Sequence, residues 1–292
     1  MNALSEVIDT LARYGMEPFD AHDVRIDGTL CRFDCIGDHR GRRNAWAVVF
    51  ADGKRPVVCF GHWSRDIHEA VVLGKGPLTS TEREQTHMAI EAAKRDREAE
   101  IARRRESARR EAVRLWRDAT PASASHPYLQ RKGIGPEGLR QSGLVLFVPM
   151  YDKHGDLWDL QRIQPNGSKR FLRGGRVSGL YATIGQSGEH ILICEGWATG
   201  RTLRDATRLP VVVAFACGNL PEVGAIMRRK YPTARLTIAA DNDTHVEANP
   251  GVTCATKAAR LVDGYVWTPP CAGDWNDYAA AGGTIAIDEV TA

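Results

Sequence analysis

The segment "LTIAADND", residues 236–243, is where an apolar run ends on two aspartates. Such a run is typical of a buried strand, and Asp241 and Asp243 follow it with one residue between them. A second apolar run, Ile191–Cys194, ends on Glu195 in the same way. In an open parallel sheet, ligands gather at the carboxyl ends of the strands. We therefore expect the three carboxylates to converge at one edge of a sheet.

The chain from residue 190 onward alternates between apolar strands and helical segments. The expected strands are 191–194, 211–216, 236–240 and 265–267, and the expected helices are 199–206, 220–230 and 252–262. Apolar strands without polar alternation, separated by helical crossovers, indicate a parallel sheet covered on both faces. This part of the chain is therefore expected to be a Rossmann-like α/β domain.

Three neighbouring carboxylates repel one another and raise each other's pKa unless a cation neutralises them. Hard divalent cations such as Mg²⁺ or Mn²⁺ prefer oxygen ligands and often complete their shell with substrate phosphates. Either aspartate alone would be read as a loop or capping residue, for which Asp is common. Three acids at two strand ends favour a metal site instead.

Two motifs make the pattern more specific. "LICEGWAT" (192–199) and "IAADND" (238–243) resemble the Toprim domain of bacterial primases, topoisomerases and some nucleases, which pairs a strand-end glutamate with an Asp-x-Asp motif. The resemblance implies that Glu195, Asp241 and Asp243 are catalytic and bind metal. The middle position of this motif is usually Gly, whereas here it is Asn242.

Further site residues follow from the same resemblance. "DWNDY" (274–278) is similar to the Asp-Pro-Asp segment of replicative primases, which adds Asp274 and Asp277 as metal ligands, although the second acid of that pattern is here Asn276. Gly218 and Asn219 resemble a Gly-Thr turn of primases, which implies a contact with nucleotide.

The lobe before this domain indicates the reaction. "HPYLQRKGI" (126–134) and the segment 148–185 resemble the primase catalytic core, a lobe that topoisomerases lack. Short strands are expected at 144–150, 157–163 and 169–172, joined by hairpin turns. The resemblance implies that Arg162, Lys169 and Arg170 line a groove for template and nucleotide. It is closest to primases of plasmids, phages and integrative elements.

Residues 1–118 are expected to form two further segments. Residues 1–75 read as a small β-rich, zinc-ribbon-like module, with an amphipathic segment at 4–14 and strands at 29–36, 45–51 and 56–60. Residues 76–118 read as a long charged linker helix capped by Ser80 or Thr81, because 81–117 is almost free of Gly and Pro. Its arginine runs could follow a phosphate backbone, or form a solvated face paired with nearby glutamates.

The zinc question concerns Cys31, Cys35, Cys59 and His62, since replicative primases carry a zinc ribbon at this position. Zinc needs four ligands in a tetrahedron, usually with tight pairs. If 29–36 is one strand, its two thiols lie about 13 Å apart at about 3.3 Å per residue, too far to share an ion. The sequence therefore favours a module that has dispensed with metal, with zinc as the alternative.

The whole chain of 292 residues is thus expected to comprise an N-terminal module (1–75), a linker helix (76–118), the first lobe of a primase core (119–185) and a Toprim domain (186–292). No apolar run approaches a membrane span, Met1–Thr10 lacks the pattern of a signal peptide, and seven scattered cysteines favour reduced thiols, which together predict a cytoplasmic protein. The net charge of +3 is too small to identify a nucleic-acid binder.

The expected activity is synthesis of short RNA primers on single-stranded DNA from nucleoside triphosphates. A metal-dependent nuclease and a non-catalytic single-stranded-DNA-binding protein of a mobile element are the alternatives, because the same acids can activate water and the late motif is atypical. No Walker-type loop is present, so any helicase or other replication partner is expected to be a separate chain.

Overall fold

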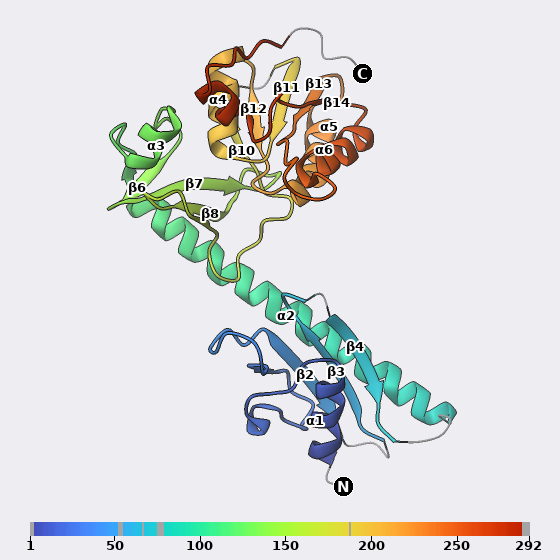
Figure 1. The fold of residues 1–292 in the computed structure, drawn as a ribbon. Coiled ribbons are helices and arrows are strands. Elements are labelled where there is room, and N and C mark those ends of the chain that lie inside the picture. Colours follow the sequence, from blue (N-terminus) through green and yellow to red (C-terminus); the bar gives the residue numbers. More distant parts are fainter. Residues whose placement is uncertain (1–2, 52–54, 66, 75–78, 187, 288–292) are drawn as a thin grey trace. The chain divides into compact units, whose positions relative to one another are not determined.

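The computed structural model describes residues 3–51, 55–65, 67–74, 79–186 and 188–287 (Figure 1). The chain divides into two compact units, Met1–Ala102 and Arg103–Ala292. The division falls inside the long helix α2 (Ser80–Asp118), whereas residues 75–78, at the expected start of the linker, lie outside the described residues. Among the described helices, none combines the length and the apolar character that crossing a membrane requires.

The long charged helix is present, but its capping residue differs from the expected one. Thr79 and Glu82 form a reciprocal cap, in which the Thr79 N–H donates to Glu82 Oε2 (2.8 Å) and the Glu82 N–H donates to Thr79 Oγ1 (3.3 Å). The prediction of Ser80 or Thr81 was therefore wrong by one or two residues. Further along, Arg109 lies 3.5 Å from Asp156 and 3.9 Å from Glu106, so this arginine has carboxylate partners.

The first unit is a four-stranded antiparallel sheet in the order β1-β2-β3-β4, with a helix on each face. Its elements are α1 (Ala3–Arg13), the short 3₁₀ helix η1 (Ala21–Asp23), β1 (Cys31–Phe33), β2 (Ala45–Phe50), β3 (Val57–His62) and β4 (Ile67–Val72). The sequence did not predict β4, because the polar residues His68 and Glu69 interrupt its apolar pattern.

Both faces of this sheet are buried. Phe60 packs with Leu11 of α1, and Cys59, the next residue back along β3, packs with Ala89 and Ala93 of α2 on the other side. Successive side chains of a strand point to opposite faces, so β2 and β3 are apolar without alternation although the sheet is antiparallel. Residues on opposite faces of this sheet therefore cannot contribute to the same site.

The second unit begins with a five-stranded antiparallel sheet in the order β5-β6-β7-β8-β9. Its elements are β5 (Thr120–Pro121), α3 (Pro127–Lys132), β6 (Arg140–Ser142), β7 (Val145–Tyr151), β8 (Leu157–Ile163) and β9 (Lys169–Arg170). Phe147 and Leu160 pack against Ala108 and Ala112 of α2. On the opposite face, Ile163 belongs to a core that continues into the C-terminal domain.

The C-terminal domain is a five-stranded sheet in the order β10-β12-β11-β13-β14, in which only the edge strand β10 is antiparallel. Its elements are β10 (Ala182–Ile184), β11 (His190–Cys194), α4 (Trp197–Thr207), β12 (Val211–Val213), the 3₁₀ helix η2 (Cys217–Asn219), α5 (Leu220–Lys230), β13 (Arg235–Ala239), α6 (Pro250–Leu261), β14 (Tyr265–Trp267) and α7 (Trp275–Ala280). The expected parallel sheet is confirmed, and β10 completes it from the end of the preceding lobe.

The helices cover both faces of this sheet, as Figure 1 shows for α4 on one side and α5 and α6 on the other. Trp197 of α4 and Trp275 of α7 pack with Leu192 and Val213 of the sheet. On the other face, α5 and α6 pack with Ile193 and Ile238. This arrangement leaves the carboxyl ends of β11 and β13 side by side, because these two strands are paired in parallel up to Cys194 and Ala239.

Candidate metal and nucleotide site

Glu195 lies at the turn between β11 and α4. Gly196 caps the helix without a side-chain hydrogen bond, and a Cβ atom built on it would lie 4.0 Å from Lys169 Nζ. Burial raises the pKa of Glu195, the charges of Asp243 and Asp274 raise it further, and the charge of Lys169 lowers it. The structure therefore places three other ionised groups close enough to act on this carboxylate.

Asp241 is the most perturbed of these acids. Burial raises its pKa to about 7, and the charges of Glu195, Asp274 and Asp243 act in the same direction. Its Oδ1 atom is buried and has no hydrogen-bond partner in the structure. A buried carboxylate oxygen without a partner costs free energy, and a cation would remove that cost. The donor set of carboxylate oxygens also suits a hard divalent cation.

Asp243 is held by the N-terminus of α6. The Gly251 N–H donates to Asp243 Oδ2 (3.2 Å), and the Asn249 Oδ1 atom accepts a hydrogen bond from the Asp243 N–H (2.9 Å). A Cβ atom at Gly251 would lie 2.3 Å from the Asp241 carbonyl oxygen and 3.0 Å from Asp243 Oδ2. Only glycine allows the helix to approach both aspartates this closely.

The two acids of the 274–278 motif, Asp274 and Asp277, have different surroundings. Asp274 caps α7 by accepting from the Asp277 N–H (2.9 Å), and its charge reaches Glu195 and Asp241. Asp277 lies 3.0 Å from Lys132 Nζ and, although burial acts against it, hydrogen bonding with Lys132 lowers its pKa. Asp277 thus already has a cationic partner, whereas Asp274 belongs with the acids at the sheet edge.

Asn276 occupies the position of the expected second acid, and its side chain is used inside the protein. Its Nδ2 donates to the Lys132 carbonyl (2.8 Å) and to Thr202 Oγ1 (2.9 Å), and the residue is buried. The amide therefore ties α7 to α3 and α4. A carboxylate here would lose both donated hydrogen bonds.

We call Glu195, Asp241, Asp243 and Asp274 the acidic cluster. Among the described residues, the one group of three potential ligands whose donor atoms all lie within 4.8 Å of one another is Cys35, Asp38 and His62, so the acids of the cluster are more widely spaced than that. Mg²⁺ commonly takes one or two protein carboxylates and completes its shell with water and phosphate oxygens. The spacing therefore fits a site completed by substrate.

The three basic residues expected in the groove lie on two faces of one sheet. Lys169 is paired with Ile163, which belongs to the core shared with the C-terminal domain, and its charge acts on Glu195 and Asp241. Arg170 is paired with Arg162 on the face that carries α2. Alternation along a strand separates neighbouring residues in this way. Only Lys169 is brought to the acids.

The Gly218–Asn219 turn lies directly before α5. Asn219 is buried, and its Nδ2 lies within hydrogen-bond distance of the carbonyls of Val177, Leu180 and Ala214 (2.7–3.1 Å). Its Oδ1 accepts from the Gly179 N–H (2.8 Å). The side-chain amide of Asn219 thus connects the backbone of residues 177–180 with that of Ala214. The resemblance to a Gly-Thr turn did not predict this structural role.

The four residues considered for zinc do not surround one point. Cys59 packs on the α2 side of its sheet, whereas Cys31 and Cys35 pack on the α1 side, and the Cys31 thiol donates to the Ala47 carbonyl. The alternative in which Cys31, Cys35, Cys59 and His62 together bind zinc is therefore wrong. The strand expected over 29–36 is also shorter, since β1 ends at Phe33.

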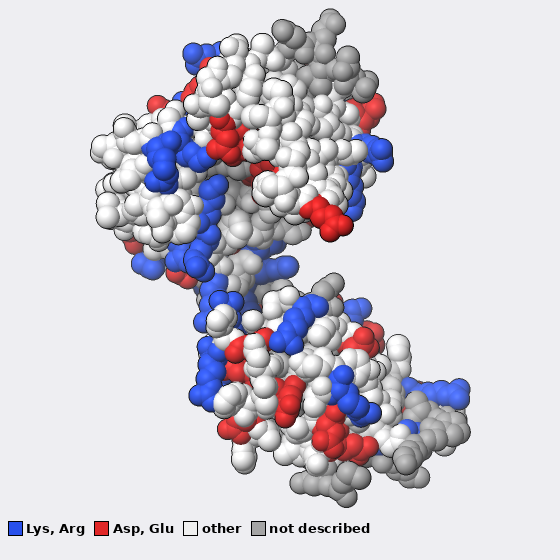
Figure 2. Space-filling model, viewed as in Figure 1, with Lys and Arg blue, Asp and Glu red and all other residues white. Residues whose placement is uncertain are grey.

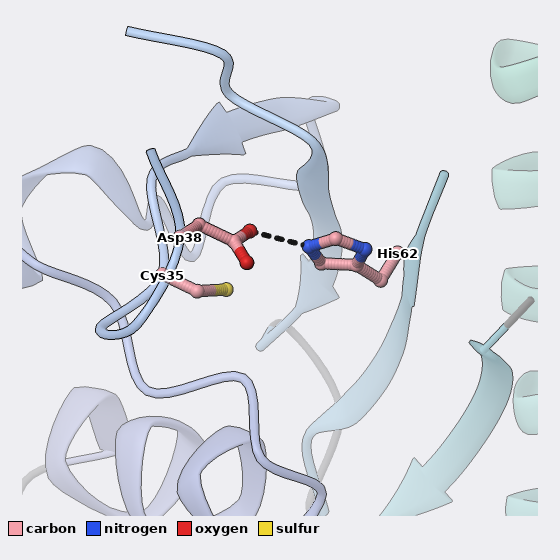
Figure 3. A group of neighbouring side chains, drawn as sticks. All are labelled: Cys35, Asp38 and His62. Atoms are coloured by element: carbon pink, nitrogen blue, oxygen red, sulfur yellow. Dashed lines mark hydrogen bonds and ion pairs between the residues drawn. The ribbon is translucent and has the colours of Figure 1, made fainter. Parts of the chain in front are cut away.

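Two of these residues meet a third that the sequence reasoning missed. Figure 3 shows Cys35, Asp38 and His62 pointing toward one another, with a hydrogen bond of 2.7 Å between His62 Nε2 and Asp38 Oδ2. Arg65 donates to the other oxygen of Asp38. Although burial acts against it, the hydrogen bonds from His62 and Arg65 lower the pKa of Asp38. The spacing Cys35-x-x-Asp38 was a signal that could have found this cluster.

A comparison with protein families finds that residues 190–284 match the Toprim domain. This match covers β11 to α7 and therefore contains the whole acidic cluster.

Two curated relatives are similar to a larger part of the chain. A DNA primase TraC of Escherichia coli is 31% identical over 276 residues, which is 89% of this chain and 26% of that protein. A second DNA primase TraC of Escherichia coli is 30% identical over 212 residues, covering 68% of this chain and 15% of that protein. The chain thus spans about a quarter or less of the length of these relatives. The structure of the DnaG primase catalytic domain bound to single-stranded DNA is similar at 12% identity with a TM-score of 0.44, covering 63% of this chain and 77% of that one.

Proposed function

We propose that this protein is a DNA primase, which joins nucleoside triphosphates into short RNA primers on single-stranded DNA. The observation that carries the proposal is the Asp241 carboxylate, buried and partnerless at one oxygen beside Glu195, Asp243 and Asp274. Sequence similarity to DNA primase TraC extends over 276 residues and so reaches well beyond the Toprim segment. That extent favours polymerisation over the chemistry of Toprim domains in general.

In this proposal the acidic cluster holds Mg²⁺ or Mn²⁺, with Glu195, Asp241 and Asp243 as ligands and Asp274 beside them. A bound divalent cation would supply positive charge to the triphosphate at this edge. Lys169 is placed to pair with phosphate oxygens, since its ammonium already acts on Glu195 and Asp241. A 3′-hydroxyl then attacks the α-phosphate and releases its proton to solvent. The new P–O bond forms as the bond from the α-phosphorus to the bridging oxygen breaks, and pyrophosphate leaves.

The opposite face of the β8–β9 ladder is the proposed contact for the nucleic-acid backbone. Arg162 and Arg170 are directly opposite each other in this ladder, and like charges in that position are destabilising. The Arg162 Nη2 atom donates to the Phe171 carbonyl (3.4 Å), while its Nε is buried and has no partner in the structure. A phosphate between the two guanidinium groups would relieve the repulsion and supply an acceptor.

The test is primer synthesis by chain 1–292 on single-stranded DNA of mixed sequence, with labelled ribonucleotides and Mg²⁺ or Mn²⁺. Asp241→Asn removes the central carboxylate and is expected to reduce product by about 10³-fold, since a bound metal contributes several kcal/mol of transition-state charge stabilisation. The matched control is Glu247→Gln, which removes an exposed carboxylate from the same loop. The control should retain full synthesis.

The same reactions distinguish the alternatives. Absence of product from a folded wild-type chain that still binds the DNA would refute the primase proposal. Loss of the input strand in those reactions, abolished by Asp241→Asn, would indicate the metal-dependent nuclease. An intact strand that remains bound would indicate the non-catalytic binding protein.

A further inference from the structure

The loop that follows β13 and the loop that follows β14 run beside each other at the acidic cluster. The Asn242 N–H donates to the Gly273 carbonyl (2.9 Å), and the Gly273 N–H donates to the Asn242 carbonyl (3.0 Å). This is an isolated antiparallel bridge. Antiparallel pairing places the residue before Asn242 next to the residue after Gly273, so Asp241 and Asp274 become neighbours.

The side chain of Asn242 adds a second connection between the two loops. Its Nδ2 donates to the carbonyls of Pro269 (3.2 Å) and Cys271 (3.1 Å) in the loop after β14. Its Oδ1 accepts from Asn249 Nδ2 (2.9 Å). Asn249 in turn accepts the Asp243 N–H and begins α6. One continuous set of hydrogen bonds therefore joins the Asp274 loop, Asn242, Asn249 and Asp243.

This set of bonds acts against a force that separates the loops. Glu195, Asp241, Asp243 and Asp274 carry like charges, and the charges of Asp243 and Asp274 add to burial in raising the pKa values of Glu195 and Asp241. The far end of the second loop has its own anchor, because Trp275 stacks on Trp267 (4.0 Å between ring centroids) and donates to its carbonyl. The part of this loop beside Asp241 is held by the backbone bridge between Asn242 and Gly273 and by the side-chain amide of Asn242.

We propose that Asn242 is a positioning residue that holds the Asp274 loop against the loop of Asp241 and Asp243, so that the acidic cluster is assembled before a cation arrives. The inference rests on the proposed function, since it takes the cluster to be the metal site. The Toprim pattern usually has Gly at this position, and Gly would retain the backbone bridge but lose all three side-chain hydrogen bonds. Asn242 is thus an addition in this chain.

The test measures metal affinity separately from catalysis. Asn242→Ala and Asn242→Gly should weaken Mn²⁺ binding by about tenfold, the lower range for residues that support metal ligands, when binding is followed by loss of the free-ion electron paramagnetic resonance signal. The Mg²⁺ concentration for half-maximal primer synthesis should rise by a similar factor. Synthesis at saturating Mg²⁺ should stay within about twofold of wild type, because the cation then closes the cluster itself.

The matched control is Thr253→Ala. Thr253 Oγ1 donates to the Ala248 carbonyl (2.6 Å), so this change removes a side-chain hydrogen bond from the loop after β13 without touching the loop after β14. Wild-type metal affinity in both Asn242 variants would overturn the inference. Equal weakening in Thr253→Ala would also overturn it, because the effect would then be general loosening of the loop. Wild-type Mn²⁺ binding by Asp241→Asn would refute the metal site itself, and the inference with it.

Discussion

The acidic cluster and the Cys35–Asp38–His62 cluster both gather side chains that can bind metal, yet their electrostatics are opposite. Burial and neighbouring carboxylates raise the pKa of Asp241 to about 7, and one of its oxygens has no partner. Asp38 has a lowered pKa because His62 and Arg65 donate to its two oxygens, against the effect of burial. The acids of the first cluster repel one another, whereas Asp38 in the second cluster is already paired with Arg65.

Oppositely charged side chains also lie close together on the surface of the first unit, where Lys and Arg stand among Asp and Glu on the face shown in Figure 2. Proximity of ligand-type side chains is therefore a weak indication of a metal site, since the tighter of the two clusters is the one that is already neutralised. A carboxylate that is buried, repelled by its neighbours and short of a hydrogen bond is the stronger indication of a cation-binding site.

Among single substitutions, the largest loss of stability is expected from breaking the Cys35–Asp38–His62 cluster. Asp38→Asn should lower the free energy of unfolding of the first unit by about 2 kcal/mol, because it leaves the fully buried His62 and the Arg65 guanidinium without their carboxylate. This is less than the cost for a fully buried ion pair, because Arg65 is 35% exposed and Asp38 15% exposed. Urea denaturation followed by tryptophan fluorescence measures the change.

The control for this variant is Asp20→Asn in the same unit. Asp20 pairs with His22, but both side chains are largely exposed, so no measurable change in stability is expected. Equal stability of Asp38→Asn and wild type would show that the network around His62 does not stabilise the fold. Loss of stability on treatment with a chelator would show instead that this cluster holds a metal.

The acidic cluster was predicted from the sequence, whereas the Cys35–Asp38–His62 cluster was not. Apolar runs ending on Glu195, Asp241 and Asp243 indicate strand ends of one parallel sheet, and parallel pairing of β11 with β13 brings those ends together. The hydrogen bond between Asp38 and His62 joins residues 24 positions apart through an irregular loop. No periodicity records such a contact. The sequence therefore favoured a module without metal, and the zinc ligands of its alternative lie on two faces of a sheet.

The placement of Arg162, Lys169 and Arg170 was predicted only in part. The sequence predicted strands that contain Arg162 and Lys169, and the resemblance to the primase core grouped these two residues with Arg170. Alternation along a strand already separates neighbours such as Lys169 and Arg170, so their placement on opposite faces was predictable and was missed. The role of Asn242 was not predictable, because its partners Pro269 and Cys271 follow a further helix and strand.

A second effect on stability should appear when the pH is changed, with opposite signs in the two clusters. The folded-state pKa of Asp241 is raised from 3.8 to about 7, so the folded state holds a proton that the unfolded chain has released. Stability of the second unit should therefore fall between pH 4 and pH 7, by up to about 1.4 kcal/mol per pH unit. Asp38 has a lowered pKa, so its contribution is present above pH 3.8 and is lost as the pH falls through the folded-state value.

Thermal unfolding of wild type and Asp241→Asn across this range measures the first slope. Asp241→Asn should reduce the fall in stability, because the amide does not ionise, and Mg²⁺ should reduce it in wild type, because the cation favours the ionised form. A slope that is the same in the variant would show that Asp241 does not titrate in this range. For the second cluster, Asp38→Asn should remove the loss of stability below pH 4.

The smallest effect concerns Arg162 and Arg170, two cations that lie directly opposite each other in the β8–β9 ladder. Arg170→Gln should weaken binding of single-stranded DNA by a few fold and reduce the slope of log affinity against log salt by about 0.7, the value for one phosphate contact on a single strand. Lys153→Gln, which removes an exposed cation from the β7–β8 turn, is the control and should leave the slope unchanged. An unchanged slope in Arg170→Gln would mean that the paired arginines do not bind the backbone. A matching loss in Lys153→Gln would mean that the basic surface acts only through its overall charge.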